Sequence, residues 1–302
     1  MTFDEDRLAA IDAPVRVFGE VPNTTDWVRR RGFSGAPHGT FAVAEALTAA
    51  VGRTGNDWSA PPGGVWSSVL LRPELDAETA GRLTLASGLA VLDTVRAFGV
   101  DAALKWPNDV VVPSGATANQ TQSDAVVVPS GAAIGGGESA VGDDPRPAKL
   151  AGVLVERVAD DVPVAGKAVS DVLDGPATLQ FVVVGVGINA DLDPSALATD
   201  RPVTTMRAAV GPVDRTAVAR ELHANLLARA GEAETEAGYA ALREEWTEAA
   251  ATLGERVVVH RDGADPVVGV ARELDETGGL VVETDDGGVV VTEGECERLR
   301  RG

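Results

Sequence analysis

The stretch Lys105-Trp106-Pro107-Asn108-Asp109 decides how the rest of the chain is interpreted. It lies between two short apolar runs, residues 102–104 and 110–112, which predicts a strand, a sharp polar turn and a second strand. Proline cannot donate to a sheet ladder, and it biases the preceding residue toward an extended conformation. The turn therefore fixes a lysine, a tryptophan and two short polar side chains at one end of a sheet, where ligands commonly bind. A structural corner that carries a surface lysine is the alternative.

Lysine is rare in this chain, because 23 of its 26 basic residues are arginines. The three lysines are Lys105, Lys149 and Lys167. Lys149 opens an apolar segment that ends at Glu156. A compact ammonium at the head of a buried strand suits a phosphate or carboxylate ligand as a point charge. The spacing of so few lysines can also arise by chance.

A third segment, Gly185-Val186-Gly187-Ile188-Asn189, closes the apolar run Phe181–Val184. Two glycines at the end of a strand let the backbone approach a ligand closely. In this order, the three segments resemble the biotin protein ligases, whose motifs read K-W-P-N-D, K-L-A-G-hydrophobic-L-hydrophobic-E and G-hydrophobic-G-hydrophobic-N. The resemblance extends from about Phe18 to the C-terminus.

The resemblance implies an α+β fold in two parts. Residues 1–252 are expected to form a class II synthetase-like catalytic domain, a mixed sheet flanked by helices. Residues 253–302 are expected to form a small SH3-like β-barrel, since short apolar runs separated by Asp-Gly and Gly-Gly turns predict strands there. Helices are predicted over 78–98, 214–230 and 235–253 from apolar spacing. Residues 113–147 and 160–177 are expected to be insertions, the first of them disordered.

Composition limits the remaining classes. The 302-residue chain has a formal charge of −20 and a sequence pI near 4.5, which disfavours nucleic-acid binding through a basic face. No apolar run approaches the roughly 20 residues of a membrane span, and the acidic start does not resemble a signal peptide. We expect a cytoplasmic protein without membrane association. The acidic excess predicts adaptation to high salt, because salt screens self-repulsion.

Few residues suit a metal site or a DNA-binding unit. Cys296 is the single cysteine and is expected to be buried in the last strand, and the three histidines lack metal-ligand spacing. We therefore expect no protein-held metal site. The segment before Val15 is too short for the helix-turn-helix that some biotin ligases carry, which disfavours a repressor role.

Two further segments correspond to biotin-binding parts of the family. Asn23-Thr24-Thr25 aligns with a family S-T-N or S-T-S stretch that contacts biotin, and Thr24 or Thr25 is also a good helix N-cap. The family loop Q-T-A-G-R-G-R-x-G-R-x-W aligns without a gap with residues 47–58. Its matches are Thr48, Ala49, Gly52, Arg53, Gly55 and Trp58, whereas Leu47, Ala50, Val51 and Asn56 replace Gln, Gly, Arg and Arg. Two lost cations and one lost polar partner predict a weakened or re-tuned site.

The family reaction joins biotin to ATP, with Mg²⁺, as biotinyl-5′-adenylate, and then transfers biotin to a lysine of a biotin carboxyl carrier domain of an acyl-CoA carboxylase. The expected catalytic residues are Lys149 and Arg53. The expected biotin-binding residues are Asn23, Thr24, Thr25, Gly52, Arg53, Trp58, Lys149 and Gly152. The expected nucleotide-binding residues are Lys105, Asn108, Asp109 and Asn189. Two alternatives stay open, namely a catalytically weak paralog that acts as a biotin sensor or reservoir, and a lipoate or octanoate ligase. Family members often pair through their central sheets, so a homodimer is compatible with the sequence.

Overall fold

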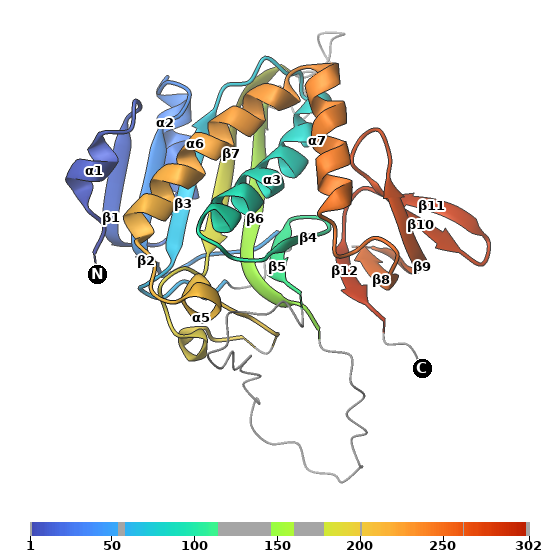
Figure 1. The fold of residues 1–302 in the computed structure, drawn as a ribbon. Helices are drawn as coiled ribbons and strands as arrows, with labels where there is room; N and C mark the ends of the chain where they lie inside the picture. Colours follow the sequence, from blue (N-terminus) through green and yellow to red (C-terminus); the bar gives the residue numbers. More distant parts are fainter. Residues whose placement is uncertain are drawn as a thin grey trace.

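A computed structural model describes residues 2–53, 58–113, 146–159, 178–199, 201–261 and 263–299. Apart from residues 113, 146 and 147, the insertions expected at 113–147 and 160–177 lie outside these ranges, as do Asn56 and Lys167. Two sheets dominate the described chain, a large one in the first part and a smaller one after residue 255 (Figure 1).

The large sheet contains seven strands in the order β1-β2-β3-β7-β6-β5-β4. They are β1 (Val15–Val21), β2 (Phe41–Leu47), β3 (Val65–Leu71), β4 (Ala103–Lys105), β5 (Asp109–Val112), β6 (Ala148–Ala159) and β7 (Leu179–Ile188). The β1–β2 pair is parallel and every other pair is antiparallel, which makes the sheet mixed, as expected. The apolar runs on either side of the K-W-P-N-D turn form the β4–β5 hairpin.

The side chains of β7 alternate between the two faces of the sheet, as a period of two requires. Val182, Val184, Val186 and Ile188 join the main core, which also contains buried residues of α3 (Arg82–Ala97) and α6 (Arg215–Ala233). On the opposite face, Phe181 and Val183 pack under α2 (Thr25–Phe33), and Gly185 and Gly187 follow them along the strand. The side chains on that face thus shrink from phenylalanine to glycine, and this opens space above the sheet.

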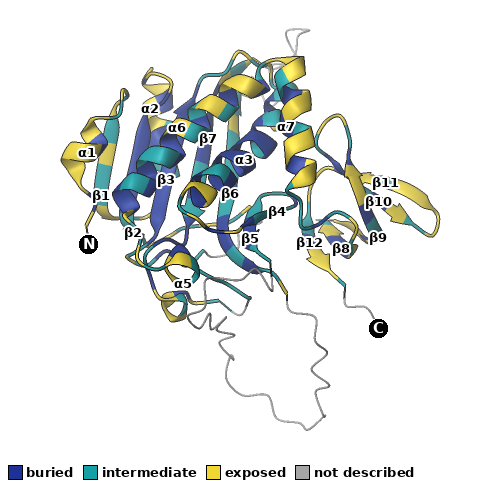
Figure 2. Cartoon of the chain, viewed as in Figure 1, coloured by how far each residue is buried: buried dark blue, intermediate teal, exposed yellow. Residues whose placement is uncertain are grey.

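The other helices and short turns complete the first part of the chain. They are α1 (Glu5–Ala9), η1 (Thr79–Gly81), η2 (Pro194–Ala196), α5 (Met206–Val210) and α7 (Glu236–Glu248). In Figure 2 the helices are buried on their inner faces and exposed outward, which is the pattern of a layered domain.

Two predicted helices are shorter than expected. The helix predicted over 78–98 begins with the 3₁₀ turn η1 and continues as α3 to Ala97; Gly99 follows with φ +86°, as a C-terminal glycine should. The helix predicted over 235–253 ends at Glu248. The next residues leave the helix because Leu104 of β4 bonds them on both sides: its N–H donates to the Ala249 carbonyl (2.8 Å), and its carbonyl accepts from the Ala251 N–H (2.7 Å).

The second sheet is antiparallel, in the order β11-β10-β9-β8-β12. Its strands are β8 (Arg256–Arg261), β9 (Ala264–Leu274), β10 (Leu280–Thr284), β11 (Gly287–Val291) and β12 (Glu295–Arg298). Cys296 is buried in β12, as expected, and burial raises the pKa of its thiol to about 11. The SH3-like character of this unit and the boundary at residues 252–253 stay predictions.

Trp106 of the K-W-P-N-D turn joins the two sheets. Its side chain is 2% exposed, its backbone N–H donates to Thr252 Oγ1 (2.9 Å), and its Nε1–H donates to the Gly278 carbonyl (3.3 Å). Gly278 lies in the loop between β9 and β10. The conspicuous tryptophan of the motif is therefore a buried connection that fixes the turn against the second sheet.

Candidate ligand site

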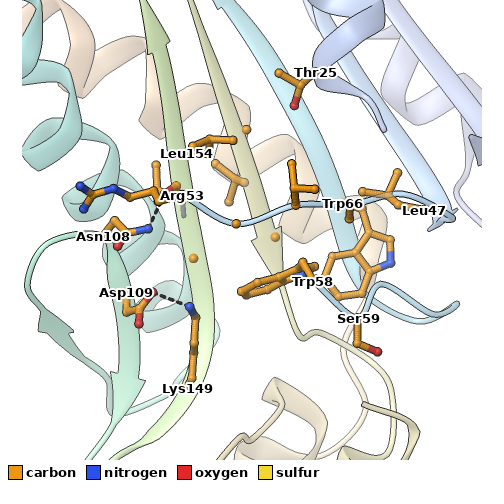
Figure 3. A pocket seen from close by; sticks show the side chains of 18 of the residues that line it. Thr25, Leu47, Arg53, Trp58, Ser59, Trp66, Asn108, Asp109, Lys149 and Leu154 are labelled. Atoms are coloured by element: carbon orange, nitrogen blue, oxygen red, sulfur yellow. Dashed lines mark hydrogen bonds and ion pairs between the residues drawn. The ribbon is translucent and has the colours of Figure 1, made fainter. Parts of the chain in front are cut away.

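A cavity of about 520 Å³ lies over the open face of β6 and β7, beyond the N-terminal end of α2 (Figure 3). All twelve predicted site residues line it: Asn23, Thr24, Thr25, Gly52, Arg53, Trp58, Lys105, Asn108, Asp109, Lys149, Gly152 and Asn189. Gly294, Glu295 and Cys296 of the second sheet contribute to the same wall. Segments that are far apart in sequence thus converge on one site, although convergence alone does not assign a role to any of them.

Glycines form the floor of the cavity. Gly152 of β6 and Gly187 of β7 are register partners, and the Trp58 ring lies across both. A Cβ on Gly152 would be 3.2 Å from two ring atoms of Trp58, and one on Gly187 would be 3.1 Å from three. Farther along the floor, a Cβ on Gly185 would be 3.2 Å from Thr25 Oγ1. The absence of side chains at Gly152 and Gly187 therefore lets a flat ring, here that of Trp58, lie directly on the sheet.

A lysine–aspartate cluster marks one end of the floor. Lys149 Nζ lies 2.6 Å from Asp109 Oδ1 and 4.7 Å from the centroid of the Trp58 ring (Figure 3). Lys105 Nζ lies 3.8 Å from Asp109 Oδ2. The β4–β5 hairpin places Lys105 and Asp109 as direct partners, and β6 brings Lys149 beside them. Two ammonium groups thus share one carboxylate, which leaves a surplus of positive charge for an anionic ligand.

The segment that resembles the family biotin loop reaches the cavity through Gly52 and Arg53. Arg53 lies on the Asp109 side, and burial lowers its pKa, although a guanidinium stays charged at neutral pH. Leu47 places an apolar side chain in the wall where the family has a glutamine, and Val51 is 52% exposed. The apolar replacements at Leu47 and Val51 therefore lie at the cavity itself.

The two asparagines differ in what they leave open. Asn108 Nδ2 donates to the Val153 carbonyl (2.7 Å), which ties the turn to β6. Asn189 is 2% exposed, and its Nδ2 donates to the carbonyls of Thr204 (3.0 Å) and Lys149 (3.4 Å). Within the part of the chain that the structure describes, Asn189 Oδ1 has no hydrogen-bond partner. Since buried amide oxygens are normally paired, this acceptor is a candidate contact for a ligand donor.

At the start of α2, Thr24 is the N-cap residue, as predicted, but its hydroxyl makes no capping hydrogen bond. Asn23 Oδ1 accepts from the Asp26 N–H at 2.8 Å instead. The asparagine before the N-cap thus satisfies one of the free N–H groups at the helix start. Thr24 and Thr25 turn toward β3 and contact Ser68 Oγ at 2.8 and 3.2 Å. Both hydroxyls are thereby held at the cavity wall.

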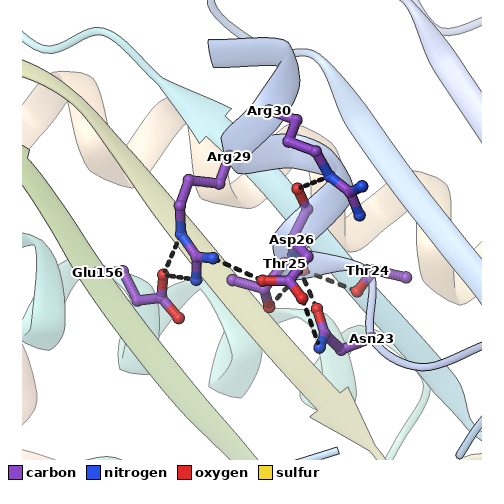
Figure 4. Close-up of polar contacts among 8 residues, drawn as sticks. Asn23, Thr24, Thr25, Asp26, Arg29, Arg30 and Glu156 are labelled. Atoms are coloured by element: carbon purple, nitrogen blue, oxygen red, sulfur yellow. Dashed lines mark hydrogen bonds and ion pairs between the residues drawn. The ribbon is translucent and has the colours of Figure 1, made fainter. Parts of the chain in front are cut away.

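The sequence analysis missed two groups of charged residues in the wall. One is an arginine of α2 with its carboxylate partners: Arg29 Nε donates to Glu156 Oε2 (3.1 Å), and Arg29 Nη1 donates to Asp26 Oδ1 (2.5 Å) (Figure 4). The other is the ion pair between Arg201 and Glu295, which joins the segment after β7 to β12. Only the terminal Glu156 of the K-L-A-G segment carried a signal, because the Arg29–Glu156 and Arg201–Glu295 contacts bridge distant parts of the sequence.

No cluster of three or more metal-binding side chains occurs among the residues the structure describes. A Mg²⁺ ion that accompanies a nucleotide needs no such cluster, since phosphates and water supply most of its ligands and the protein supplies one or two carboxylates. Among the carboxylates that line the cavity, Asp109 lies beside Lys149 and Lys105 and would supply such a ligand where phosphates are expected. Within the described ranges, no helix is long and apolar enough to cross a membrane.

The architecture is that of known biotin protein ligases. The structure of the Aquifex aeolicus enzyme in complex with biotin and ATP superimposes with a TM-score of 0.64 at 22% identity, over 95% of this chain and 99% of that one. This likeness confirms the fold expected from the sequence, a mixed sheet with helices followed by an antiparallel sheet.

Sequence comparison identifies the family. Residues 18–189 match the model of the biotin/lipoate A/B protein ligase family, and residues 252–299 match the biotin protein ligase C-terminal domain. The chain therefore belongs to the biotin/lipoate A/B protein ligase family. Two similar proteins are biotin–[acetyl-CoA-carboxylase] ligases. That of Mycobacterium tuberculosis is 29% identical over 296 residues, covering 94% of this chain and 88% of the relative, and that of Paracoccus denitrificans is 28% identical over 267 residues, covering 86% and 89%.

Proposed function

We propose that this protein is an ATP-dependent biotin protein ligase that forms biotinyl-5′-adenylate and transfers biotin to a lysine of a biotin carboxyl carrier domain. One observation carries the proposal: Lys149 Nζ lies 2.6 Å from Asp109, at the head of a glycine floor that a flat ligand can cover. The names of the M. tuberculosis and P. denitrificans relatives, which specify the acetyl-CoA carboxylase as acceptor, support the choice of carrier.

In the first step, an oxygen of the biotin carboxylate attacks the α-phosphorus of ATP, and the bond to the pyrophosphate oxygen breaks. Both reactants are anions, so the site must hold them together and stabilise the charge that builds on the phosphorane. Lys149 is the proposed cation for both groups, and Arg53 would hold the adenylate. Since Lys149 is paired with Asp109 in this structure, the incoming anion must share or displace that partner.

The nucleotide would lie toward the β4–β5 turn. Lys105 would contact its phosphates, and Asp109 would help to hold Mg²⁺. Asn189 Oδ1 would accept a bond from the adenine amino group, because this oxygen has no partner in the described chain. Asn108 would act by positioning the turn, since its amide is already bonded to β6. Mg²⁺ would neutralise phosphate charge when bound.

The other end of the floor would hold biotin. Thr25 presents its hydroxyl beside Gly185, and Thr24 lines the same wall. Gly52 and Gly152, which also line the cavity, would lie along the valeryl chain and carboxylate. Trp58 covers Gly152 and Gly187 here, so its ring must share the floor with the ligand or move aside. Asn23 would act through the start of α2, where its Oδ1 accepts from the Asp26 N–H.

In the second step, the ε-amino group of the carrier lysine attacks the mixed anhydride, an amide bond forms, AMP leaves and the amine loses a proton. Gly294–Cys296 of the second sheet reach the cavity wall, which supports a role for that sheet at the carrier side. We propose residues 1–252 as the catalytic domain and 253–302 as the C-terminal domain, in a cytoplasmic enzyme that either acts alone or pairs through its large sheet.

The test uses purified protein with biotin, ATP, Mg²⁺ and a carrier domain in molar KCl, and follows pyrophosphate release together with carrier mass. A mass gain of one biotin that requires ATP is the expected result. Pyrophosphate without carrier modification would place the defect in the transfer step. Bound biotin without either signal, beside an active control ligase, would overturn the proposal.

That last outcome would favour a biotin sensor or reservoir. Leu47 supports this second candidate, because an apolar side chain in the cavity wall cannot pair with a polar group of the ligand. A lipoate or octanoate ligase is the remaining candidate, and the same apolar Leu47 side chain would suit the apolar tail of either acid.

A further inference from the structure

The Arg29 cluster, which consists of Asn23, Asp26, Arg29 and Glu156, contributes to the cavity wall beyond the Thr24–Thr25 end (Figure 4). Asn23 Nδ2 donates to Asp26 Oδ2 (3.1 Å), Arg29 Nη1 donates to Asp26 Oδ1 (2.5 Å), and Arg29 Nε donates to Glu156 Oε2 (3.1 Å). One continuous chain of hydrogen bonds therefore runs from the start of α2 to β6.

The strand geometry places this cluster along the floor. Gly152, Leu154 and Glu156 alternate onto the cavity face of β6, and all three line the cavity. At about 3.4 Å per residue, Glu156 lies about 14 Å along the strand from Gly152, with Leu154 between them. A ligand whose carboxylate lies at Lys149 would therefore direct its far end toward Arg29 and Glu156.

The cluster retains both donors and an acceptor for a ligand. Both Arg29 contacts to Glu156 fall on Oε2, which leaves Oε1 without a partner in the described chain. Three of the five guanidinium N–H groups are used, which leaves two. The side chains of Arg29 and Glu156 are 35% and 28% exposed, so both lie partly covered at the wall.

We propose that the Arg29 cluster selects acids with a cyclic urea at the far end over acids with an apolar tail, an inference that rests on the proposed function. A urea carries N–H donors beside a carbonyl acceptor, which complements Glu156 Oε1 beside the free Arg29 N–H groups. An alkyl or dithiolane tail would cover these groups without pairing them, and unpaired polar groups disfavour the complex. The cluster thus supplies the polar recognition that Leu47 cannot.

The test measures equilibrium binding by titration calorimetry in molar KCl, with biotin, desthiobiotin and octanoate as probes. The double variant Arg29→Met/Glu156→Leu removes both charges together, so neither partner is left as an uncompensated charge. Its ratio of octanoate Kd to biotin Kd should fall about tenfold or more from the wild-type ratio. Desthiobiotin keeps the urea but lacks the sulfur-containing ring, and its Kd should change in the double variant by about the same factor as that of biotin.

Arg30→Met is the matched control. Arg30 follows Arg29 on α2, its Nε donates to the Asp26 carbonyl, and it does not line the cavity, so the ratio should not change. If the double variant fails to fold, Glu156→Gln is used instead, which replaces one carboxylate oxygen by an NH₂ group. It should weaken the binding of biotin and desthiobiotin more than the binding of octanoate.

Three results would overturn the inference: an unchanged ratio in a folded variant, desthiobiotin that follows octanoate, or wild-type protein that binds none of the acids. Biotin binding with the predicted ratios but without pyrophosphate release would overturn only the proposed ligase activity. The two proposals can therefore fail separately.

Discussion

Replacing Lys149 by methionine tests the proposed chemistry most directly. Methionine keeps much of the aliphatic stem and removes the ammonium that lies 2.6 Å from Asp109 and 4.7 Å from the Trp58 ring centroid. The reaction should suffer far more than the fold, because the proposed role of the charge is to hold two anions together. The two effects can be estimated separately.

The cost in stability follows from the partial exposure of the pair. The side chains of Lys149 and Asp109 are 27% and 14% exposed, and Lys105 remains 3.8 Å from the same carboxylate. A pair with this much solvent and a second cation should contribute about 1 kcal/mol, between the values of exposed and buried pairs. The cation–π contact adds about 0.5–1 kcal/mol. The free energy of unfolding should therefore fall by about 1.5–2 kcal/mol, and Tm by a few degrees.

The loss of activity should be larger. Removing one preorganised group that stabilises developing negative charge typically lowers kcat by about 10²–10³. The assay is biotin-dependent exchange between pyrophosphate and ATP, run beside urea unfolding of the same preparation. Lys105→Met is the matched control: this lysine contacts the same carboxylate from farther away, and its loss should lower exchange by about tenfold at most. If Lys149→Met kept activity within about threefold of wild type, the assignment of Lys149 would be refuted.

Three further predictions concern the floor, the core and the surface. Gly187→Ala would place a Cβ 3.1 Å from the Trp58 ring. We expect the free energy of unfolding to fall by less than about 1 kcal/mol, but the affinity for biotin or ATP, measured by calorimetry, to fall about tenfold. Unchanged affinities would contradict the assignment of Gly187 to the floor. Burial lowers the pKa of His223 from its ordinary value of 6.5. Below pH 6.5 the unfolded state therefore binds more protons than the folded state, so the free energy of unfolding decreases as the pH falls, by at most about 1.4 kcal/mol per pH unit. In urea titrations between about pH 5 and 7, His223→Gln should lose this slope and the exposed His260→Gln should keep it. Because the chain has a formal charge of −20, the midpoint of urea unfolding should rise as KCl is raised from about 0.1 to 2 M. A midpoint that does not change with KCl would contradict salt adaptation.

Local patterns in the sequence were sufficient to predict most of the fold. The run from Phe181 to Asn189 predicted β7, and Gly99 predicted the end of α3, because burial and turn chemistry act over a few residues. The end of α7 could not be predicted in this way. Residues 249–253 continue a helical pattern, but hydrogen bonds to Leu104, which lies about 145 residues earlier in the chain, draw them out of the helix. The five-residue helices α1 and α5 are too short to show a period.

The site divides in the same way. The motifs identified Lys149, Asp109 and the glycines, since each residue type has a recognisable use at a strand end. The Arg29–Glu156 contact could not be predicted, because it depends on which face of β6 carries residue 156 and on where α2 crosses the sheet. Sequence reasoning placed Trp106 at the sheet end where a ligand would bind, and Trp106 does line the cavity; its role in fixing the turn against the second sheet could not be predicted, because it depends on Gly278, far along the chain.

The charge balance of the cavity would allow so acidic a protein to bind the anionic ligands of the proposed reaction. Lys149 and Arg201 are each held by a carboxylate. The Arg201 contact lowers the pKa of Glu295 so that this partner stays ionised at neutral pH. The cations are thus held in place by their partners before any ligand arrives. A phosphate or carboxylate that enters exchanges one anionic partner for another, which costs less reorganisation than recruiting a mobile side chain. Affinity at this site should therefore depend on geometry more than on the net charge of the chain.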